Sequence, residues 1–181
     1  MTQPSTENSP PIHWLDLKDD VLLADCRFEA FRGSGPGGQK RNKTSSMIRL
    51  THLPTGFHVV AGESRSQAEN KARAVRRLKL KLATDIRHPV DPMGFEPPTW
   101  FAQVTQLGRL AISHHNDHYA RAAALVLDLL EFRSGSVGDV AKLLGVTTSS
   151  IAKFLMEDPH LWTAANAIRK LAGRGPLEKR R

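Results

Sequence analysis

Cysteine is nearly absent from this sequence, in which Cys26 is the only one among 181 residues. No disulfide can therefore form within the chain, and this use of cysteine is typical of a reducing compartment. Long apolar runs are also lacking, because the longest, residues 122–130, is interrupted by Asp128 and is too short to span a membrane. The first residues show neither a secretory signal nor an arginine-rich transit peptide. We therefore expect a soluble, cytoplasmic protein without membrane contacts.

Acidic residues are outnumbered by basic ones. The chain holds 26 Lys and Arg against 18 Asp and Glu, which gives a formal net charge of +8 and a pI near 10.1. The surplus is concentrated in residues 24–86, which carry thirteen Lys and Arg against five Asp and Glu. A localised excess of this kind indicates a polyanionic partner such as a nucleic acid.

Alternation of apolar and polar residues predicts three strands in the first half of the chain. The pattern runs along Cys26–Phe31, Met47–His52 and residues 57–61. Pro54 and Gly56 lie between the last two segments at positions that favour a type I turn. We therefore expect a small mixed sheet that contains a β-hairpin, in a domain of the α+β class.

A basic helix is predicted after the hairpin. Ser66 and Glu69 have the spacing of a capping box, which marks the first turn of a helix. The positions that recur at steps of three or four, and that we expect to pack on the sheet, are Ala68, Ala72, Val75, Leu78 and Leu82. Cations crowd the remaining positions. A solvated helix face would mix charges of both signs, so this excess favours contact with nucleic acid.

The chain divides by composition into five segments. We expect a disordered N-terminus (1–11), the α+β domain (12–87), a proline-rich linker (88–98), a small all-α helical domain (99–172) and a short basic tail (173–181). The helical domain begins with an amphipathic segment formed by Trp100, Phe101, Val104 and Leu107. Its later helices are predicted to start at the capping residues Ser136, Thr147 or Thr148, and Asp158.

The loop between the first two predicted strands has the most unusual composition. Gly35, Gly37 and Gly38 lie within four positions, and they permit backbone dihedral angles that other residues avoid. Gln39 follows them and is flanked by cations. The free N–H groups of such a loop are able to bind a phosphate, or to stabilise an oxyanion and hold a water molecule. The loop by itself leaves both uses open.

The order of strand, Gly-Gly-Gln loop, hairpin and basic helix resembles the catalytic domain of class I peptide chain release factors. The matching residues are Arg32, Ser34-Gly35-Pro36-Gly37-Gly38-Gln39, Asn42-Lys43, Ser46, Arg49-Leu50, His52, Pro54-Thr55-Gly56, Arg65-Ser66-Gln67 and Asn70-Lys71. A lone Gly-Gly-Gln would be a weak signal, whereas the whole series in register is specific. A glycine turn in an unrelated basic fold would leave the later matches unexplained.

The resemblance implies hydrolysis of the peptidyl-tRNA ester in the ribosomal peptidyl transferase centre, without a cofactor or metal. It assigns oxyanion stabilisation and water placement to Gln39, and close backbone approach to Gly37 and Gly38. Gln39 is also the position at which the family is methylated, which implies a methyltransferase partner. The residues that would contact rRNA and tRNA phosphates are Arg32, Lys40, Arg41, Asn42, Lys43, Arg49, Arg65, Lys71, Arg73, Arg76, Arg77, Lys79 and Lys81.

Two departures from the family refine the expectation. Arg41 stands where the family usually has a small apolar residue. About thirty residues precede the loop, too few for the stop-codon-reading domain of a release factor. The chain therefore looks like the stand-alone branch that rescues stalled ribosomes without reading a codon. That branch usually ends in a long basic tail, and here a helical domain takes its place. We expect a monomer whose helical domain docks on the ribosome or the tRNA.

Two alternatives remain open. The first is a ribosome-binding factor that keeps the fold but does not hydrolyse the ester. The second is a DNA-binding regulator, because Ala141, Gly145 and Ile151 have the offsets of a helix-turn-helix. Its groove-facing residues would be Thr147, Thr148, Ser149, Ser150 and Lys153. Only Lys153 is charged in that set, and structural helical hairpins share the pattern.

Histidines raise the question of a metal site. His114, His115 and His118 lie close together in the sequence, but only Asp117 stands nearby as a further ligand. A solvated helix start is the better interpretation, so we predict no metal.

Overall fold

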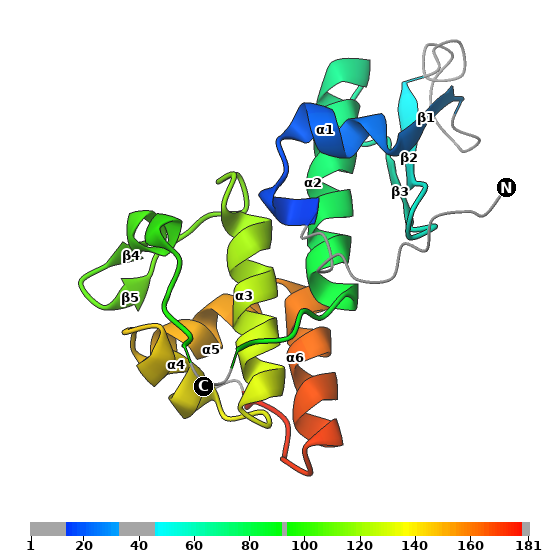
Figure 1. Cartoon of the computed structure of the whole chain (residues 1–181). Coiled ribbons are helices and arrows are strands. Elements are labelled where there is room, and N and C mark those ends of the chain that lie inside the picture. The colour runs from blue at the N-terminus through cyan, green and yellow to red at the C-terminus, as the bar shows by residue number, and fades with distance from the viewer. Residues whose placement is uncertain (1–13, 33–45, 92–93, 179–181) are drawn as a thin grey trace, which may run out of the picture.

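The computed structural model describes residues 14–32, 46–91 and 94–178, and it shows a small sheet joined by one long helix to a bundle of shorter helices (Figure 1). The described elements are the 3-10 helices η1 (Trp14–Asp16) and η2 (Thr99–Val104), the helices α1 (Asp19–Ala24), α2 (Gln67–Asp85), α3 (Tyr119–Phe132), α4 (Val137–Leu143), α5 (Thr148–Glu157) and α6 (Pro159–Leu171), and the strands β1 (Cys26–Phe31), β2 (Met47–His52), β3 (His58–Ala61), β4 (Thr105–Gln106) and β5 (Arg109–Leu110). The α+β class is confirmed.

The sheet has the order β1-β2-β3 and is antiparallel throughout its described strands, rather than mixed. Phe28 pairs with Leu50, and Leu50 pairs with Val59 on the other side, so these side chains share one face. Helix α2 packs on β2 and β3, and Ile48 and Leu50 on β2 are fully buried. The apolar positions of the alternating pattern on β2 are therefore the ones that face the core.

Helix α2 begins as predicted, but it buries a different stripe. The Ser66 hydroxyl accepts a hydrogen bond from the Glu69 N–H at 3.3 Å, as an N-cap residue does. Val75, Leu78 and Leu82 are buried, whereas Ala68 and Ala72 are exposed, so the prediction was wrong at these two positions. The buried positions of the first two turns are instead Asn70 and Ala74. The reason is that α2 lies between the sheet and α3, and this double contact rotates the buried stripe.

One hydrophobic core extends through both parts of the chain. It contains Leu22 and Leu50 beside the sheet, Leu78 on α2, and Leu127 and Leu155 in the helical bundle. Helix α3 contacts α2 directly, and α6 packs on α3 and also reaches α2. The domain boundaries at residues 87 and 99 remain a prediction, and the core shows that the two parts share buried surface.

The junction between α2 and the bundle carries a buried ion pair. Asp128 on α3 is 6% exposed, and its carboxylate accepts hydrogen bonds from the Arg87 guanidinium at 2.7 Å and from the His88 N–H at 3.1 Å. Arg87 also donates to the carbonyl of Ala83, near the end of α2. Burial raises the pKa of Asp128 and lowers the pKa of Arg87, and the attraction between the two charges opposes both shifts. The pair fixes the end of α2 on α3.

The helical part follows the capping signals, with one correction. Ser136, Thr147 and Asp158 accept hydrogen bonds as the N-caps of α4, α5 and α6. The predicted helical segment that included Leu107 ends earlier, at Val104, and β4 and β5 form a short hairpin after it. Leu107 and Gly108 occupy its turn with φ angles of 49° and 68°, as a two-residue hairpin turn requires. Leu107 is therefore 94% exposed and does not belong to an apolar stripe.

The described part of the C-terminal tail folds back on the bundle. The guanidinium of Arg174 donates to the Ser134 carbonyl at 2.5 Å, and Arg169 donates to the Gly135 carbonyl at 2.6 Å. The Leu177 N–H donates to the side chain of Asn166 at 2.8 Å. Residues 174–177 are therefore held against α6 and the turn before α4.

We expect the substitution Asp128→Ala to lower the free energy of unfolding by about 3 kcal/mol, because it leaves the Arg87 guanidinium half-buried without its counter-charge. Urea unfolding followed by circular dichroism measures the change. Glu96→Ala, at an exposed acid before η2, is the matched control and should change stability by less than about 0.5 kcal/mol. Equal effects of the two substitutions would show that the ion pair does not hold the junction.

Candidate functional site

The predicted catalytic loop lies outside the described residues. Residues 33–45 include Gly37, Gly38 and Gln39, and also the predicted RNA contacts at positions 40–43. The structure describes both anchors of this segment. β1 and β2 pair up to Phe31 and Met47, so the segment leaves and rejoins the sheet at neighbouring positions. The catalytic assignment to the loop therefore stays a prediction, and the geometry of its base is established.

A buried asparagine fixes the return end of this segment. Asn70 is fully buried, and its side-chain amide donates to the carbonyls of Ser46 and Ser64, both at 2.7 Å. Its carbonyl oxygen accepts from the Ser64 N–H at 3.0 Å. One side chain thus joins the first residue after the loop to the β3–α2 connection and to α2 itself. Because an amide buried without partners is costly, these bonds specify a single arrangement.

Sequence reasoning missed this role of Asn70. The residue was part of the resemblance, but the predicted apolar stripe of α2 passed through Ala68 and Ala72 instead. A signal was present in the steps of four from Asn70 through Ala74, Leu78 and Leu82, which form the stripe that the structure buries. Because the first residue of that stripe is polar, a search for apolar positions did not find it.

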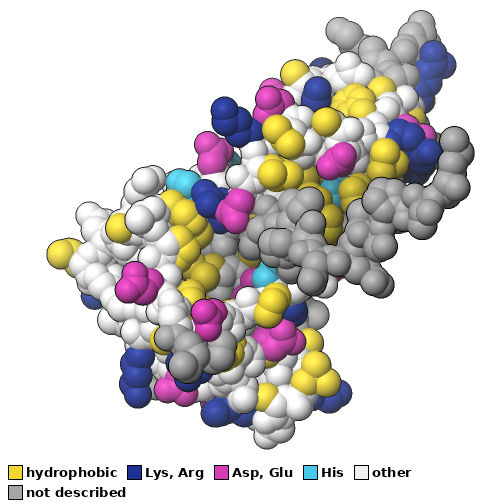
Figure 2. Space-filling view, in the orientation of Figure 1, with side chains coloured by type: hydrophobic (Ala, Val, Ile, Leu, Met, Phe, Trp, Pro, Cys, Tyr) yellow, Lys and Arg dark blue, Asp and Glu magenta, His cyan; other side chains and the backbone are white. Residues whose placement is uncertain are grey.

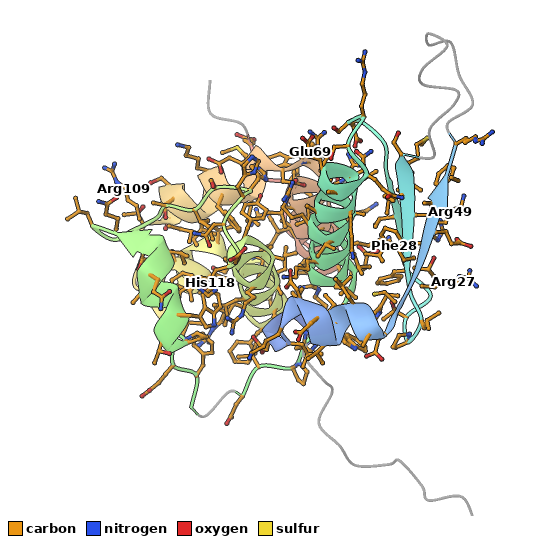
Figure 3. The ribbon with its side chains drawn as sticks, turned by 90° about the horizontal axis from the view of Figure 1, so that it is seen from above. Arg27, Phe28, Arg49, Glu69, Arg109 and His118 are labelled. Atoms are coloured by element: carbon orange, nitrogen blue, oxygen red, sulfur yellow. The ribbon has the colours of Figure 1, made fainter. Side chains whose placement is uncertain are left out.

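Close packing around Met47 completes the base of the loop. A Cβ added at Gly62 would lie 2.7 Å from the Cγ of Met47, so any larger residue there would require the Met47 side chain to move. Phe31 pairs with Met47 across the sheet, and the centre of its ring lies 5.3 Å from the guanidinium of Arg49. Figure 3 shows Arg49 and Phe28 on the two neighbouring strands, and their register places them on opposite faces of the sheet.

The cations predicted to bind RNA divide into two groups. Several are neutralised by acidic neighbours: Arg77 lies 2.5 Å and Arg73 3.9 Å from Glu63, Lys79 pairs with Asp19, and Lys81 lies 2.7 Å from Asp85. Burial alone would raise the pKa of Glu63, but the hydrogen bond from Arg77 holds it below its ordinary value. Acidic side chains therefore lie among the basic ones on the face that Figure 2 shows.

The second group of these cations has no acidic partner among the described side chains. Within the described ranges, no acidic side chain pairs with Arg32, Arg65, Lys71 or Arg76. Arg32 is exposed at the loop anchor, and Arg65 is exposed just before α2. The ammonium group of Lys71 lies 5.2 Å from the centre of the Phe28 ring, which holds it over the edge of the sheet. The unpaired charge therefore lies near the loop and along the first half of α2.

The histidines before α3 take part in ring contacts. His118 stacks on Trp100 at 5.2 Å, and the Arg121 guanidinium lies 4.7 Å from the centre of the Trp100 ring. His114 lies 4.4 Å from the ring of Tyr119. In the part of the chain that the structure describes, no three His, Cys, Asp or Glu side chains are grouped so that they could hold a metal ion.

The helix-turn-helix residues are largely structural. Ala141 and Ile151 are buried, and Gly145 has a φ of 65° between α4 and α5. Ser150, which the DNA-binding alternative placed toward the groove, is buried and accepts a hydrogen bond from the Leu110 N–H at 3.2 Å. Lys153 is exposed, 4.0 Å from Glu157. The β4–β5 hairpin thus occupies part of the surface that this alternative needs.

Across its described residues, the chain has no helix that combines the length and the apolar character needed to cross a membrane.

Comparisons with known proteins match the first part of the chain. The RF-1 domain family model matches residues 16–91. Peptide chain release factor 1 of Acidiphilium cryptum is 47% identical over 72 residues, which are 40% of this chain and 20% of that protein. Peptide chain release factor 1 of Treponema pallidum is 42% identical over 90 residues, 44% of this chain and 26% of that protein. Peptide chain release factor 2 of Corynebacterium glutamicum is 51% identical over 63 residues, 35% of this chain and 17% of that protein. The chain thus spans about a fifth of the length of these relatives.

We expect Asn70→Asp to lower the free energy of unfolding by about 3 kcal/mol, because it replaces the two N–H donors with a carboxylate that faces two carbonyl oxygens. Thermal and urea unfolding measure the loss. Gln67→Glu makes the same amide-to-acid change at an exposed position in the first turn of α2, where a negative charge suits the helix dipole. It should leave stability unchanged or slightly higher. A tolerated Asn70→Asp would contradict the role given to this amide.

Proposed function

We propose that this chain hydrolyses the ester of peptidyl-tRNA on the ribosome, because its residues 16–91 belong to the catalytic domain family of class I release factors. That match extends on both sides of Gly37-Gly38-Gln39, and it is the observation that carries the proposal. The relatives are named as peptide chain release factors, which supports a role in ending translation. The chain corresponds to only a part of them, so its activity rests on the domain and not on the whole relative.

The chemistry needs no side-chain nucleophile. Water attacks the ester carbonyl carbon, and the carbonyl oxygen becomes negatively charged in the tetrahedral intermediate. The backbone N–H of Gln39 donates to that oxygen, and its side-chain amide places the water. The bond to the ribose oxygen then breaks, and the ribose oxygen takes up the proton that the attacking water gives up. Gly37 and Gly38 allow the backbone to approach the ester. Methylation of Gln39 by a partner enzyme belongs to the same proposal.

The described framework supports this use of the loop. β1 and β2 pair up to the residues beside the segment, and Asn70 fixes its return end to α2. A catalytic backbone N–H gains from such an anchor, because a donor that is already oriented loses little entropy when charge develops. Arg32 and Arg65 lie near this base without described acidic partners, and they are suited to contact RNA phosphates.

We extend the proposal to codon-independent rescue of stalled ribosomes. The sheet and α2 correspond to the release factor domain, and the helical bundle packs directly on α2 through α3 and α6. These contacts support a bundle that approaches the ribosome or the tRNA together with the catalytic domain. In this proposal the protein acts as a monomer, and the bundle contributes to the choice of stalled complex.

The sharpest test compares two substitutions at Gln39 in the full chain. Gln39→Pro removes the backbone N–H, and we expect it to slow peptide release by about 100-fold or more. Gln39→Ala keeps the N–H and removes only the amide side chain, so it should lose less. Release of labelled peptide from ribosomes stalled on truncated mRNA measures both rates. Gln106→Ala, an exposed amide on β4, is the matched control and should release peptide normally.

Three results would contradict parts of this proposal. A wild-type protein that binds ribosomes but releases no peptide would identify a non-hydrolytic ribosome-binding factor. Gln39→Pro with full activity would refute the role of the backbone N–H. Release that requires a stop codon in the mRNA, measured on otherwise identical complexes, would refute codon independence while leaving hydrolysis intact.

A further inference from the structure

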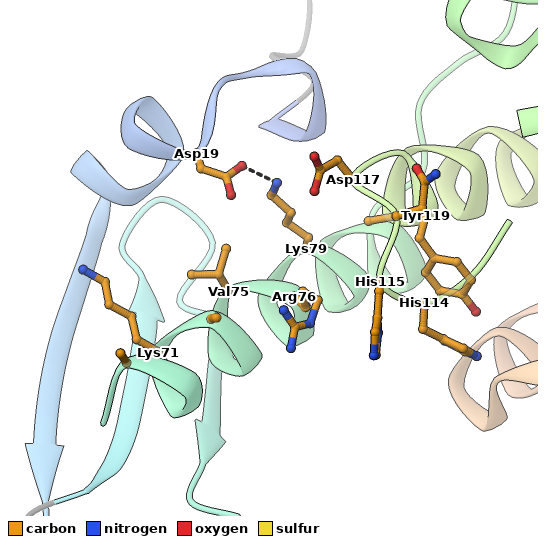
Figure 4. A pocket seen from close by; sticks show the side chains of 13 residues that line it. Asp19, Lys71, Val75, Arg76, Lys79, His114, His115, Asp117 and Tyr119 are labelled. Carbon is orange, nitrogen blue, oxygen red and sulfur yellow. Dashed lines mark hydrogen bonds and ion pairs between the residues drawn. The ribbon is translucent and has the colours of Figure 1, made fainter. Parts of the chain in front are cut away.

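A groove on one side of α2 combines residues from the sheet domain and from the helical bundle. It has a volume of about 350 Å³ and is lined by α1, α2 and the segment that leads into α3. Lys71 and Arg76 line it from α2, and His114 and His115 line it from the other wall. Figure 4 shows the side chains of Arg76 and His115 on these two walls. The groove exists only because the bundle packs beside the first half of α2.

The charges in the groove are unevenly distributed. Asp19 pairs with Lys79, and Asp117 lines the groove near that pair (Figure 4). The acidic side chains are therefore gathered where Lys79 already supplies a positive charge. Arg76 is exposed and has no acidic partner among the described side chains, and Lys71 lies over the ring of Phe28. The positive charge of the groove opposite the histidines therefore comes from Arg76, while the ammonium group of Lys71 points toward β1 (Figure 4).

The floor of this groove explains the two alanines that the sequence placed wrongly. Ala68 and Ala72 are exposed and line the groove one helical turn apart. Their methyl groups leave the space between α2 and the histidine wall open. A long side chain at either position would fill it. The apolar pattern at these positions therefore keeps a channel free, and it does not contribute to the core.

We propose that this groove binds the phosphodiester backbone of RNA. The guanidinium of Arg76 offers two parallel N–H donors to a phosphate, and the imidazoles of His114 and His115 offer further donors from the opposite wall. Because these donors lie on both walls of the groove, they suit a chain that passes between them. The inference rests on the ribosomal partner proposed above, but it does not depend on ester hydrolysis. It gives the helical bundle a direct part in RNA recognition.

The experiment measures binding of the full chain to a fluorescently labelled RNA hairpin at several KCl concentrations. Arg76→Gln should weaken binding about 5- to 10-fold near 0.1 M salt, and it should reduce the slope of log affinity against log salt by about one, since one phosphate contact is lost. Lys142→Gln removes the same charge from an exposed position on α4, away from the groove. It should change neither quantity.

Two further variants separate contact from general charge. Ala72→Leu fills the floor without changing the charge, and the double substitution His114→Ala with His115→Ala removes the opposite wall. Each should weaken binding several-fold, with thermal unfolding confirming that the fold is kept. If Ala72→Leu binds RNA normally, or if Arg76→Gln and Lys142→Gln lose affinity equally, the groove is not the binding site.

Competition distinguishes the sources of phosphate. Inorganic phosphate at low millimolar concentration should not displace the hairpin, and displacement would indicate a small-anion site instead. A duplex DNA of the same sequence should bind with lower affinity, and equal affinity would overturn the assignment to RNA. Gln39→Pro should bind the hairpin normally. If the protein binds the hairpin through the groove but does not hydrolyse the ester, only the catalytic proposal is refuted. If it hydrolyses the ester but the groove variants bind the hairpin normally, only this inference is refuted.

Discussion

Helix α2 is packed on two sides, against the sheet and against α3, and this constraint organises the rest of the molecule. A helix in that position must bury a wide stripe, so its apolar positions extend from Val75 to Leu82 and Ala83. Its first turn lies beside the base of the loop, where Asn70 is buried together with the carbonyl of Ser46. The same helix therefore supports the loop through one polar side chain and the bundle through its apolar ones.

Acidic neighbours also reduce the positive charge that α2 presents to solvent. Lys79 and Lys81 on α2 are paired with acids, and Arg77 is hydrogen-bonded to Glu63 and to the backbone of β3. These pairs are partly exposed, so each contributes little to stability, but they remove charge from the surface that a polyanion meets. Among the described residues that were predicted to bind RNA, Arg32, Arg65, Lys71 and Arg76 have no acidic partner. Net charge by itself would have suggested a much broader basic face.

Local signals in the sequence predicted most of the fold. Strand alternation located β1, β2 and β3, and the capping residues Ser66 and Ser136 located the starts of α2 and α4. These signals succeed because they depend on neighbouring residues alone. The exposed Ala68 and Ala72 and the β4–β5 hairpin were not predicted, since each is decided by what packs nearby.

The sequence predicts residue types for the candidate site, and these stay a prediction, but it did not predict the side chains that support the site. Gly37 to Gln39 were identified by their composition and by resemblance, and they lie outside the described residues. Asn70 was invisible as an anchor, because its three hydrogen bonds join segments that meet only in the folded chain. The division of the cations into neutralised and available ones has the same origin: Asp19, the partner of Lys79, comes from sixty positions earlier in the chain.

The continuous core has a consequence for how such chains can be recombined. If the part that matches the RF-1 domain model were cut off after residue 91, the apolar side of α2 that now meets α3 would be exposed, and Arg87 would lose Asp128 as its counter-ion. A chimera that receives this domain must therefore supply a helix that packs on α2 and a carboxylate that can pair with Arg87. Neither half can be exchanged alone, because each buries apolar surface and an ionised group of the other.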